Sequence, residues 1–466
     1  MIRFIFFSFS VTMAILPPFF LGRPNGESSH NFHLKKMFKE RERNVLEDYP
    51  YLQVHNFSQK LDHFDPYNKE KWNQKYFYNP IYSRNNSIIF LMIGGEGPEN
   101  GHWASYPDVQ YLQWAKEFGA DVFDLEHRFF GDSWPYPNMN TSSLEYAMVV
   151  ENDLRITDSL CAKTVKESFE QIQQLSLTLD GRSNLSTVFN LVPPFDIKTT
   201  KLDVNNFFGN LFNVFQGMTQ YTYDGQSERT HSNMTVRKMC DIMTDSKESN
   251  LVVRVKNLFQ WYNLFEEPDL SYIPNSYYDV INQLGSGDLK TLGSDGAAAR
   301  GWMWLCCNEI GFLQTTDQGA NVFGSTVPLN LFIDMCTDMF GLDVKMTIIQ
   351  RNNKKSQNYY GGADRYNATN IVLPNGSLDP WHALGTYNMN NHTSMYPYLI
   401  NGTAHCADMY PSYDNEPVAL SAARAFIKQN VKKFINYDPI ADGPKSQSTK
   451  HFRVMFSLFI FFIFFF

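Results

Sequence analysis

Two residues that can share a proton lie near the end of the chain, in the order aspartate then histidine. Asp379 follows the apolar run Ile371–Leu373, which predicts a buried strand that the next residues, Pro-Asn-Gly, break. His405 follows a second apolar run, Met395–Ile400. A carboxylate that orients an imidazole lets the histidine act as general base for a nucleophile. The two residues therefore predict the last two members of a nucleophile–Asp–His triad.

Each member of this pair also has an ordinary structural interpretation. A turn aspartate is commonly solvated, and a lone histidine is more often a satisfied structural residue than a catalyst. The pairing at two strand ends, with the family likeness given below, favours the triad. His382 and Cys406 lie beside the pair and are expected to be its neighbours, not participants.

A glycine-rich loop follows the strong strand candidate Ile88–Ile93. Its residues are Gly94, Gly95, Glu96 and Gly97, and glycine there would let backbone N–H groups face a reacting oxygen. Such a loop after an early strand can supply an oxyanion-hole donor. An ordinary tight turn is the alternative.

The elements around these residues predict an α/β protein. An early hairpin is expected within His55–Pro80, and Ala120–Arg128 predicts the strand after Ile88–Ile93, with a helix ending before Gly119 between them. This β-α-β unit favours a mainly parallel sheet.

Helical patterns replace strand patterns from Ala147 onward. One amphipathic face holds Val165, Phe169, Ile172 and Leu179, and we expect Asp180-Gly181 to stop that helix. A second face holds Val255, Leu258, Phe259 and Tyr262. A last helix is expected to open at Pro417, with Leu420, Ala423, Ile427 and Phe434 on its buried side. A helical region between the two sets of strands predicts an inserted cap.

The composition limits the partners. A net charge of −8 argues against nucleic acid, which usually binds a basic face. The six cysteines do not have zinc-site spacings, so disulfides are the favoured interpretation. No metal or other cofactor is expected. The expected pairs are Cys161–Cys240 and Cys307–Cys336. The sequence leaves the oligomeric state open, a homodimer included.

The two ends of the chain have targeting patterns. Residues 1–22 predict a secretory signal peptide, with Arg3 before an apolar stretch that is short for a membrane anchor. The apolar tail Val454–Phe466, after a polar spacer, resembles a GPI-attachment signal, with a tail of no function as the alternative. Nine Asn-x-Ser/Thr sequences fit a lumenal route and hence a glycoprotein, although Asn375 and Asn401 lie too near the Asp and His loops for glycans to be expected there.

Several segments in order resemble the family of serine peptidases that includes lysosomal prolyl carboxypeptidase, dipeptidyl peptidase II and thymus-specific serine protease. The likeness runs from about residue 50 to about residue 435, which is far more specific than one short motif. The segments are Gln59–Phe64, Gly94–Pro98, Phe118–Ser133, Val149–Arg155, Cys307–Thr315, Asn375–Trp381 and Gly402–Pro411.

The resemblance implies an α/β-hydrolase core with an inserted helical cap. It implies a secreted or lysosomal exopeptidase that cleaves short peptides, often after proline or alanine. Asp379 and His405 take the triad positions by this likeness, and Glu96 and Glu309 are candidates for contacting the amine of a peptide, with a salt bridge or a surface role as the alternative. The domains expected are the core at 46–146 and 366–436, the cap at 147–365, and a spacer and tail at 437–466.

One part of the family pattern is missing from the sequence. In the family, the segment equivalent to Leu144–Tyr146 is followed by a helix, a strand, a Gly-x-Ser-x-Gly elbow with the nucleophile, and another strand. Here it runs directly into Ala147–Val150, and no Gly-x-Ser-x-Gly occurs anywhere. The central nucleophile strand is therefore expected to be absent, so that the flanking strands must pair anew or the product folds poorly.

No other serine fits the place of the nucleophile. Ser133 and Ser286 lie near glycines, but neither follows a strand and opens a helix, and Ser133 is best interpreted as a turn hydroxyl. Loss of the nucleophile removes on the order of 10⁶ in turnover. The chain is therefore predicted to be an inactive serine peptidase, with a peptide-binding pseudoenzyme or a misspliced product as the alternatives.

Overall fold

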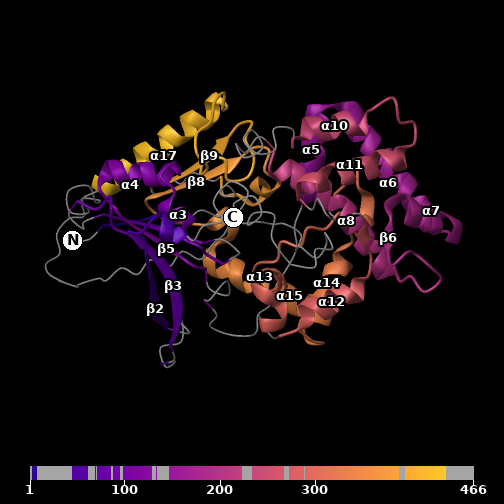
Figure 1. Cartoon of the computed structure of the whole chain (residues 1–466), viewed down its shortest axis with the longest axis horizontal. Helices are drawn as coiled ribbons and strands as arrows, with labels where there is room; N and C mark the ends of the chain where they lie inside the picture. Colours follow the sequence, from indigo (N-terminus) through magenta and orange to yellow (C-terminus); the bar gives the residue numbers. More distant parts are fainter. Residues whose placement is uncertain are drawn as a thin grey trace.

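The computed structural model of this chain describes most residues between 45 and 436, together with one short N-terminal strand. The described residues are 3–7, 45–60, 69, 71–84, 88–94, 98–127, 133, 146–222, 234–266, 272–287, 289–317, 319–387 and 394–436. Strands and helices both contribute, which confirms the α/β class in its coarse form. Figure 1 shows the larger sheet in one half of the molecule and most helices in the other.

Five strands form the larger sheet, in the order β1-β4-β5-β3-β2. They are β1 (Arg3–Phe7), β2 (Gln53–Lys60), β3 (Lys71–Asn79), β4 (Ile88–Ile93) and β5 (Asp121–Leu125). β2 and β3 form the expected hairpin, β3 is antiparallel to β5, and β5, β4 and β1 are mutually parallel. The β-α-β prediction is confirmed, since the helices between β4 and β5 are α3 (His102–Ser105) and α4 (Gln110–Phe118).

The strand β1 was not expected from the sequence. Its residues fall within the segment that predicts a signal peptide, whereas residues 8–22 lie outside the described part. β1 pairs with β4 in register from Arg3 opposite Ile88 to Phe7 opposite Met92. The free side of β4 is therefore paired by the start of the chain.

A second, two-stranded parallel sheet carries the Asp and His loops. It consists of β8 (Ile371–Gly376) and β9 (Met395–Ile400), in the same half of the molecule as the larger sheet (Figure 1). The expectation that Pro374-Asn375-Gly376 breaks the first strand is wrong, because β8 continues to Gly376. A proline fits there because β8 pairs with β9 alone among the described strands, so one side of its backbone needs no donor.

Helices fill the chain between the two sheets and after the second. A two-stranded sheet, β6 (Leu191–Val192) with β7 (Ile273–Pro274), joins this region. The remaining elements are α2 (Val45–Asp48), α5 (Tyr146–Thr157), α6 (Ser159–Ser176), α7 (Leu179–Phe189), α8 (Lys201–Gln220), α10 (Val236–Met243), α11 (Leu251–Glu266), α12 (Tyr277–Gly285), α13 (Leu289–Leu305), the π-helix η2 (Cys306–Ile310), the 3₁₀-helices η3 (Gly324–Thr326) and η4 (Pro380–Leu384), α14 (Leu329–Phe340), α15 (Met346–Tyr360), α16 (Gly362–Arg365) and α17 (Val418–Asn436).

The expected helix stop at Asp180-Gly181 is wrong. α6 ends at Ser176, and Thr178 caps the next helix, α7, by accepting a hydrogen bond from Gly181 N. Leu179 is consequently exposed instead of sharing the buried face of α6. The faces predicted for α11 and α17 are buried as expected, except that Ile435 takes the place predicted for Phe434.

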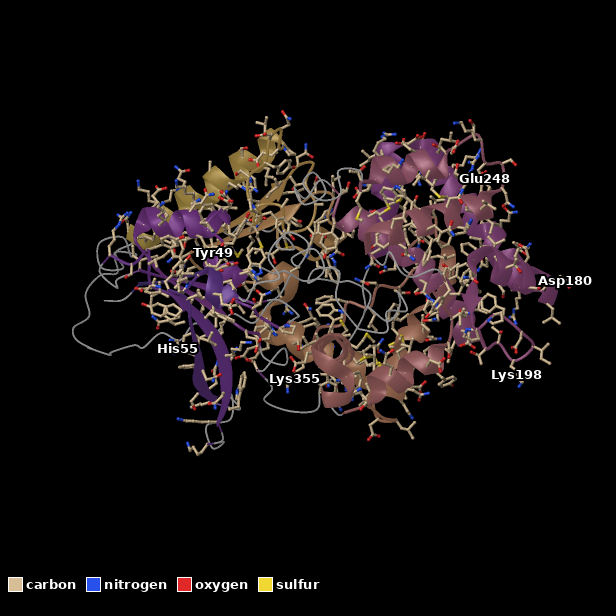
Figure 2. The ribbon with its side chains drawn as sticks, in the orientation of Figure 1. Tyr49, His55, Asp180, Lys198, Glu248 and Lys355 are labelled. Carbon is tan, nitrogen blue, oxygen red and sulfur yellow. A yellow bond between two sulfur atoms is a disulfide. The ribbon has the colours of Figure 1, made fainter. Side chains whose placement is uncertain are left out.

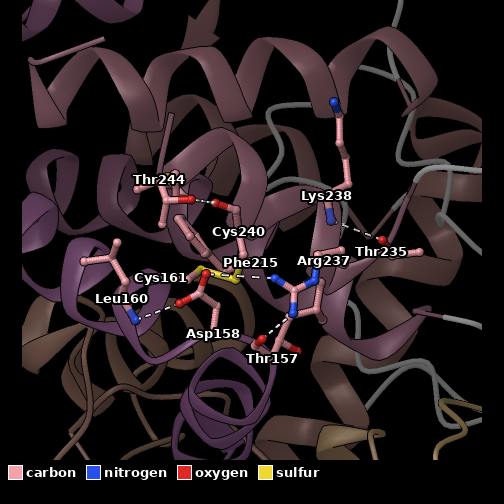
Figure 3. Close-up of a disulfide and its surroundings, with 12 residues drawn as sticks. Thr157, Asp158, Leu160, Cys161, Phe215, Thr235, Arg237, Lys238, Cys240 and Thr244 are labelled. Atoms are coloured by element: carbon pink, nitrogen blue, oxygen red, sulfur yellow. Dashed lines mark hydrogen bonds and ion pairs between the residues drawn. A yellow bond between two sulfur atoms is a disulfide. The ribbon is translucent and has the colours of Figure 1, made fainter. Parts of the chain in front are cut away.

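Two large apolar cores form within the described residues. One gathers the helices and extends from Ala147 to Trp381, and the other lies between the larger sheet, α4 and α17. Two disulfides join helices in the first core, Cys161–Cys240 between α6 and α10 and Cys307–Cys336 between η2 and α14. Both expected pairings are confirmed, and Figure 3 shows the first of them with Arg237 directed at Asp158 beside it.

Candidate active site

Asp379 and His405 meet at the carboxyl ends of β8 and β9. The distance between Asp379 Oδ2 and His405 Nδ1 is 2.7 Å, and both side chains are buried, with 5% and 2% of their residue surfaces exposed. The other carboxylate oxygen, Oδ1, accepts a hydrogen bond of 3.0 Å from Trp381 N at the start of η4. Asp379 therefore caps η4 with one oxygen and orients the imidazole with the other.

The close approach of the two loops depends on a residue without a side chain. Parallel pairing places Gly376 opposite Ile400, so the turns that follow lie side by side. A Cβ at Gly376 would lie 2.6 Å from Thr403 O, which is too close for any other residue. Ser377 N donates to Ile400 O and Leu378 N donates to Thr403 O, which fixes the loops to each other.

The end of α8 supports the pair from the helical side. His405 N donates to Gln220 O at 2.9 Å, and Trp381 Nε1 donates to Gln220 Oε1 at 3.2 Å. Tyr221 packs edge-on against the imidazole, with ring centroids 5.9 Å apart. The last turn of α8 thus holds both loops, a role that the sequence did not indicate because Gln220 lies 159 residues before Asp379 in the chain.

The second imidazole nitrogen is the reactive one in this geometry. Since Nδ1 faces a carboxylate, it carries a hydrogen and donates it, which leaves Nε2 as the acceptor in the neutral ring. Nε2 of His405 is buried and has no hydrogen-bond partner among the described residues. A hydroxyl placed at this nitrogen would complete a triad.

Neither alternative serine supplies that hydroxyl among the described contacts. Ser133 is fully buried under the other sheet, where its Oγ donates to Glu126 Oε1 at 2.9 Å and accepts from Lys75 N at 3.0 Å. Ser286 follows the last turn of α12. The hydroxyl of Ser133 therefore already donates one hydrogen bond and accepts another, both far from His405 in the chain.

The carboxyl of Asp153 is also buried, and the charge of Asp379 acts on it. Asp153 on α5 is 2% exposed, and neither of its oxygens has a hydrogen-bond partner in the described part of the chain. Burial, and secondly the charge of Asp379, raises the pKa of Asp153 to about 8. No sequence pattern indicated Asp153, since a helical pattern does not show that α5 packs against η4.

Two groups that follow Asp379 also respond to burial. Burial lowers the pKa of His382, an effect that the charge of Asp379 partly offsets, so the neutral imidazole is favoured there. Burial and the same charge raise the pKa of Tyr387 to about 12. Cys406 is half-buried with a positive φ of 57° and packs towards the apolar core of the larger sheet.

The expected oxyanion loop is only partly described. Gly94 lies at the end of β4, where its N donates to Leu125 O at 2.8 Å, whereas Gly95, Glu96 and Gly97 lie outside the described residues. Glu309 is in the π-helix η2 with an exposed side chain. Within the described residues, no group of three or more His, Cys, Asp or Glu side chains could hold a metal ion.

The sequence profile described as serine carboxypeptidase S28 matches residues 59–146 and 138–427 of this chain. These two stretches cover well over half of the sequence. The chain belongs to the serine carboxypeptidase S28 family. The S28 profile is matched in two pieces, and the pieces meet between residues 138 and 146.

Named relatives agree with this assignment. The chain is 61% identical over 508 positions to the Caenorhabditis elegans protein named "Putative serine protease F56F10.1", with 94% of each chain covered. It is 23% identical to the thymus-specific serine protease of Mus musculus, covering 84% of this chain and 88% of that protein. It is 20% identical to the human lysosomal Pro-X carboxypeptidase, and the alignment covers 81% of this chain and 87% of that protein.

The alignment with the Caenorhabditis elegans relative has more positions than the number of residues that this chain contributes to it. It spans 508 positions, whereas 94% of 466 residues is about 438, so about 70 positions of the relative have no counterpart here. This relative therefore has about 70 aligned positions more than this chain, and the S28 profile is matched in two overlapping pieces.

Proposed function

We propose that this chain is an S28 serine-peptidase scaffold that keeps the Asp–His pair and binds short peptides but does not hydrolyse them. The observation that carries the proposal is the pair itself, buried with Nδ1 on Asp379 and Nε2 without a partner in the described structure. An orienting carboxylate and a free imidazole nitrogen are what a serine nucleophile requires. The sequence contains no Gly-x-Ser-x-Gly to supply that serine.

The division of the profile match supports the same proposal. The two matched pieces overlap at residues 138–146, and the family pattern predicts the elbow directly after Tyr146. The central nucleophile strand of an α/β-hydrolase core, with the helices after Tyr146 as its cap, would then be the part that is lost. By likeness to the family, the substrates are short peptides with proline or alanine before the cleaved bond. The expected location is the lysosome or the outside of the cell. The name of the lysosomal Pro-X carboxypeptidases states the lysosome for those proteins.

A fluorophosphonate probe tests whether the chain has an activated serine. We expect no covalent label on the purified chain and no release from proline- or alanine-containing peptide substrates, since the imidazole has no hydroxyl to deprotonate. The Caenorhabditis elegans relative, prepared in the same way, is the positive control. A label on any serine of this chain, lost in the H405A variant, would show that a nucleophile is present and would overturn the proposal.

A shortened product of a gene for an active peptidase is the second candidate. The observation that favours it is the surplus of about 70 aligned positions in a 61% identical relative, which have no counterpart here. The family pattern in the sequence predicts that they would enter between residues 146 and 147. Sequencing the transcript across these two codons tests it. A transcript that encodes an elbow at this junction supports this candidate, and a continuous genomic sequence without one excludes it.

A further inference from the structure

The strand β2 is an edge of the larger sheet that no other described element covers. It pairs with β3 on one side, and no described strand pairs with its second side. All of its residues except Gln59 are exposed, and Figure 1 shows the strand on the outer side of β3. The backbone N–H and C=O groups on the second side of β2 can therefore pair with a strand of another chain.

The residues of β2 lack the features that usually keep an edge strand from pairing. The strand is eight residues long, and all eight pair with β3 in one continuous register, so no bulge turns its free side away. It contains no proline, and Lys60, its last residue, is its only lysine or arginine. Val54 and Phe57 are 42% and 44% exposed. A long, regular and partly apolar edge of this kind promotes association unless something covers it.

An acceptor sequence for N-glycosylation lies in the middle of this strand. It is Asn56-Phe57-Ser58, and both Asn56 and Ser58 are exposed. Successive side chains of a strand alternate between the two faces of the sheet, so Asn56 shares a face with Val54 and is followed by Phe57 on the other face. An N-linked glycan is bulky and hydrophilic. A glycan on Asn56 would therefore stand between the two exposed apolar side chains and obstruct a second strand.

We propose that Asn56 carries an N-linked glycan and that this glycan protects the free side of β2 from pairing with other chains. The donor is an oligosaccharide linked to a lipid diphosphate. Asn56 Nδ2 forms a bond to the first sugar carbon, the bond from that carbon to the phosphate oxygen breaks, and the amide gives up one proton as the lipid diphosphate leaves. The inference rests on the lumenal route in the proposed function, and it does not depend on whether the chain hydrolyses peptides.

A second exposed acceptor sequence provides a control on the same chain. Asn184 begins Asn-Leu-Ser on α7, and its side chain is exposed like that of Asn56. The backbone groups around Asn184 are paired within the helix, so a glycan there protects no strand edge. The two asparagines therefore share the modification chemistry and differ in what the glycan covers.

Mapping of the modified asparagines in the full chain, secreted from insect cells, tests the modification. Enzymatic release of N-glycans converts each modified asparagine to aspartate, which mass spectrometry detects in the corresponding peptide. We expect Asn56 to be modified in most molecules. S58T should retain the modification and S58A should lose it, because the acceptor sequence requires a hydroxyl at this position.

The pattern of modified sites separates this inference from the location on which it rests. A glycan on Asn184 with none on Asn56 would overturn the inference and leave the lumenal route standing. A chain without a glycan at any asparagine would overturn both the inference and the expected location.

Substitutions at position 56 test the protective role. N56Q removes the glycan from the edge of β2, and N184Q removes one from α7. We expect N56Q to contain at least about tenfold more associated chain than N184Q, as measured by size-exclusion chromatography with light scattering. N56K carries no glycan but places a charge on the edge strand, so it should reduce the association seen in N56Q. Equal association in N56Q and N184Q, or association in N56K as strong as in N56Q, would overturn the protective role.

Discussion

Asp153 shows that the polar chemistry near the Asp–His pair extends beyond the two residues that the sequence indicates. α5 brings its carboxyl into a dry region where no described group neutralises it, and the charge of Asp379 adds to the cost of ionisation. Two carboxyl groups in one apolar region tend to share a single negative charge. We therefore expect Asp153 to be the protonated member at neutral pH.

The stability of the chain should fall as the pH rises because of Asp153. Its pKa is raised from an ordinary value near 3.8 to about 8, so the folded chain binds this proton more tightly than the unfolded chain. The contribution is complete below about pH 4 and is lost progressively towards pH 8. We expect the free energy of unfolding in urea to fall by up to about 5 kcal/mol over this window, and D153N to remove most of that fall.

An exposed carboxyl provides the control for Asp153. Asp180 lies in the first turn of α7 at the outer end of the helical region, as Figure 2 shows. D180N removes the same charge from a solvated position and should keep the wild-type dependence on pH. A wild-type slope that D153N leaves unchanged would mean that Asp153 does not hold this proton.

Ser133 is expected to be structural. S133A leaves Glu126 Oε1 and Lys75 N without this partner in a buried place, so we expect a loss of about 1–3 kcal/mol in the free energy of unfolding. S421A, which removes an exposed hydrogen bond to Glu416, should cost less than about 0.5 kcal/mol. Equal costs for the two variants in urea unfolding would contradict the buried network.

At the scale of elements, the turn after β4 requires a residue without a side chain. A Cβ at Gly94 would lie 2.6 Å from Glu99 Cγ, and the Glu99 backbone is itself held by a hydrogen bond of 2.9 Å from its N to Glu126 Oε2. We expect G94A to lower the free energy of unfolding by about 1–3 kcal/mol through overpacking. G285A is the control, because nothing lies within 4 Å of a Cβ at the end of α12, and it should be neutral or slightly stabilising.

The two disulfides allow a matched comparison between elements. Cys161–Cys240 closes a loop of 79 residues and Cys307–Cys336 a loop of 29. Loop-closure entropy predicts losses of about 4.5 and about 3.6 kcal/mol when each pair is replaced by alanine. Thermal and urea unfolding of the two double variants checks the order. A larger loss for the shorter loop would indicate that packing around η2, not chain entropy, sets its value.

An element could be predicted from the sequence where one local signal decides it. The hairpin of β2 and β3, the apolar strand β4 and the end of α4 at Gly119, with φ of 70°, all follow from residue patterns. The prediction failed where two helices adjoin, because the capping threonine Thr178 lies inside an apparently continuous apolar face. It also failed at β8, where pairing on one side alone tolerates a proline.

The contact between Asp379 and His405 could be predicted, because each residue follows a strand and the two come in the order of a triad. The residues that surround them could not be predicted. Gln220 and Asp153 reach the pair from helices whose packing depends on contacts between segments more than 150 residues apart. The expected roles of Gly95, Glu96 and Gly97 stay predictions. Periodicity reports which face of a helix is buried and says nothing of which neighbour covers it.

The two apolar cores draw on different parts of the chain, and the change from one to the other occurs near α5. The helical core begins at Ala147, the residue after the overlap of the two profile matches. Among the described residues from α5 to η4, the core of the larger sheet has no fully buried member, although Val372 packs against it. No described helix is long and apolar enough to cross a membrane. The helices from α5 onward therefore have an apolar core of their own, separate from that of the larger sheet.

Restoring the segment that the family pattern contains should restore hydrolysis. We expect a chimera with the extra residues of the Caenorhabditis elegans relative between Tyr146 and Ala147 to react with a fluorophosphonate and to cleave peptides. H405A in the chimera should lower turnover by on the order of 10³-fold or more, because the serine then has no base. A chimera that unfolds cooperatively but reacts with no fluorophosphonate would show that the segment does not deliver a nucleophile to Nε2 of His405.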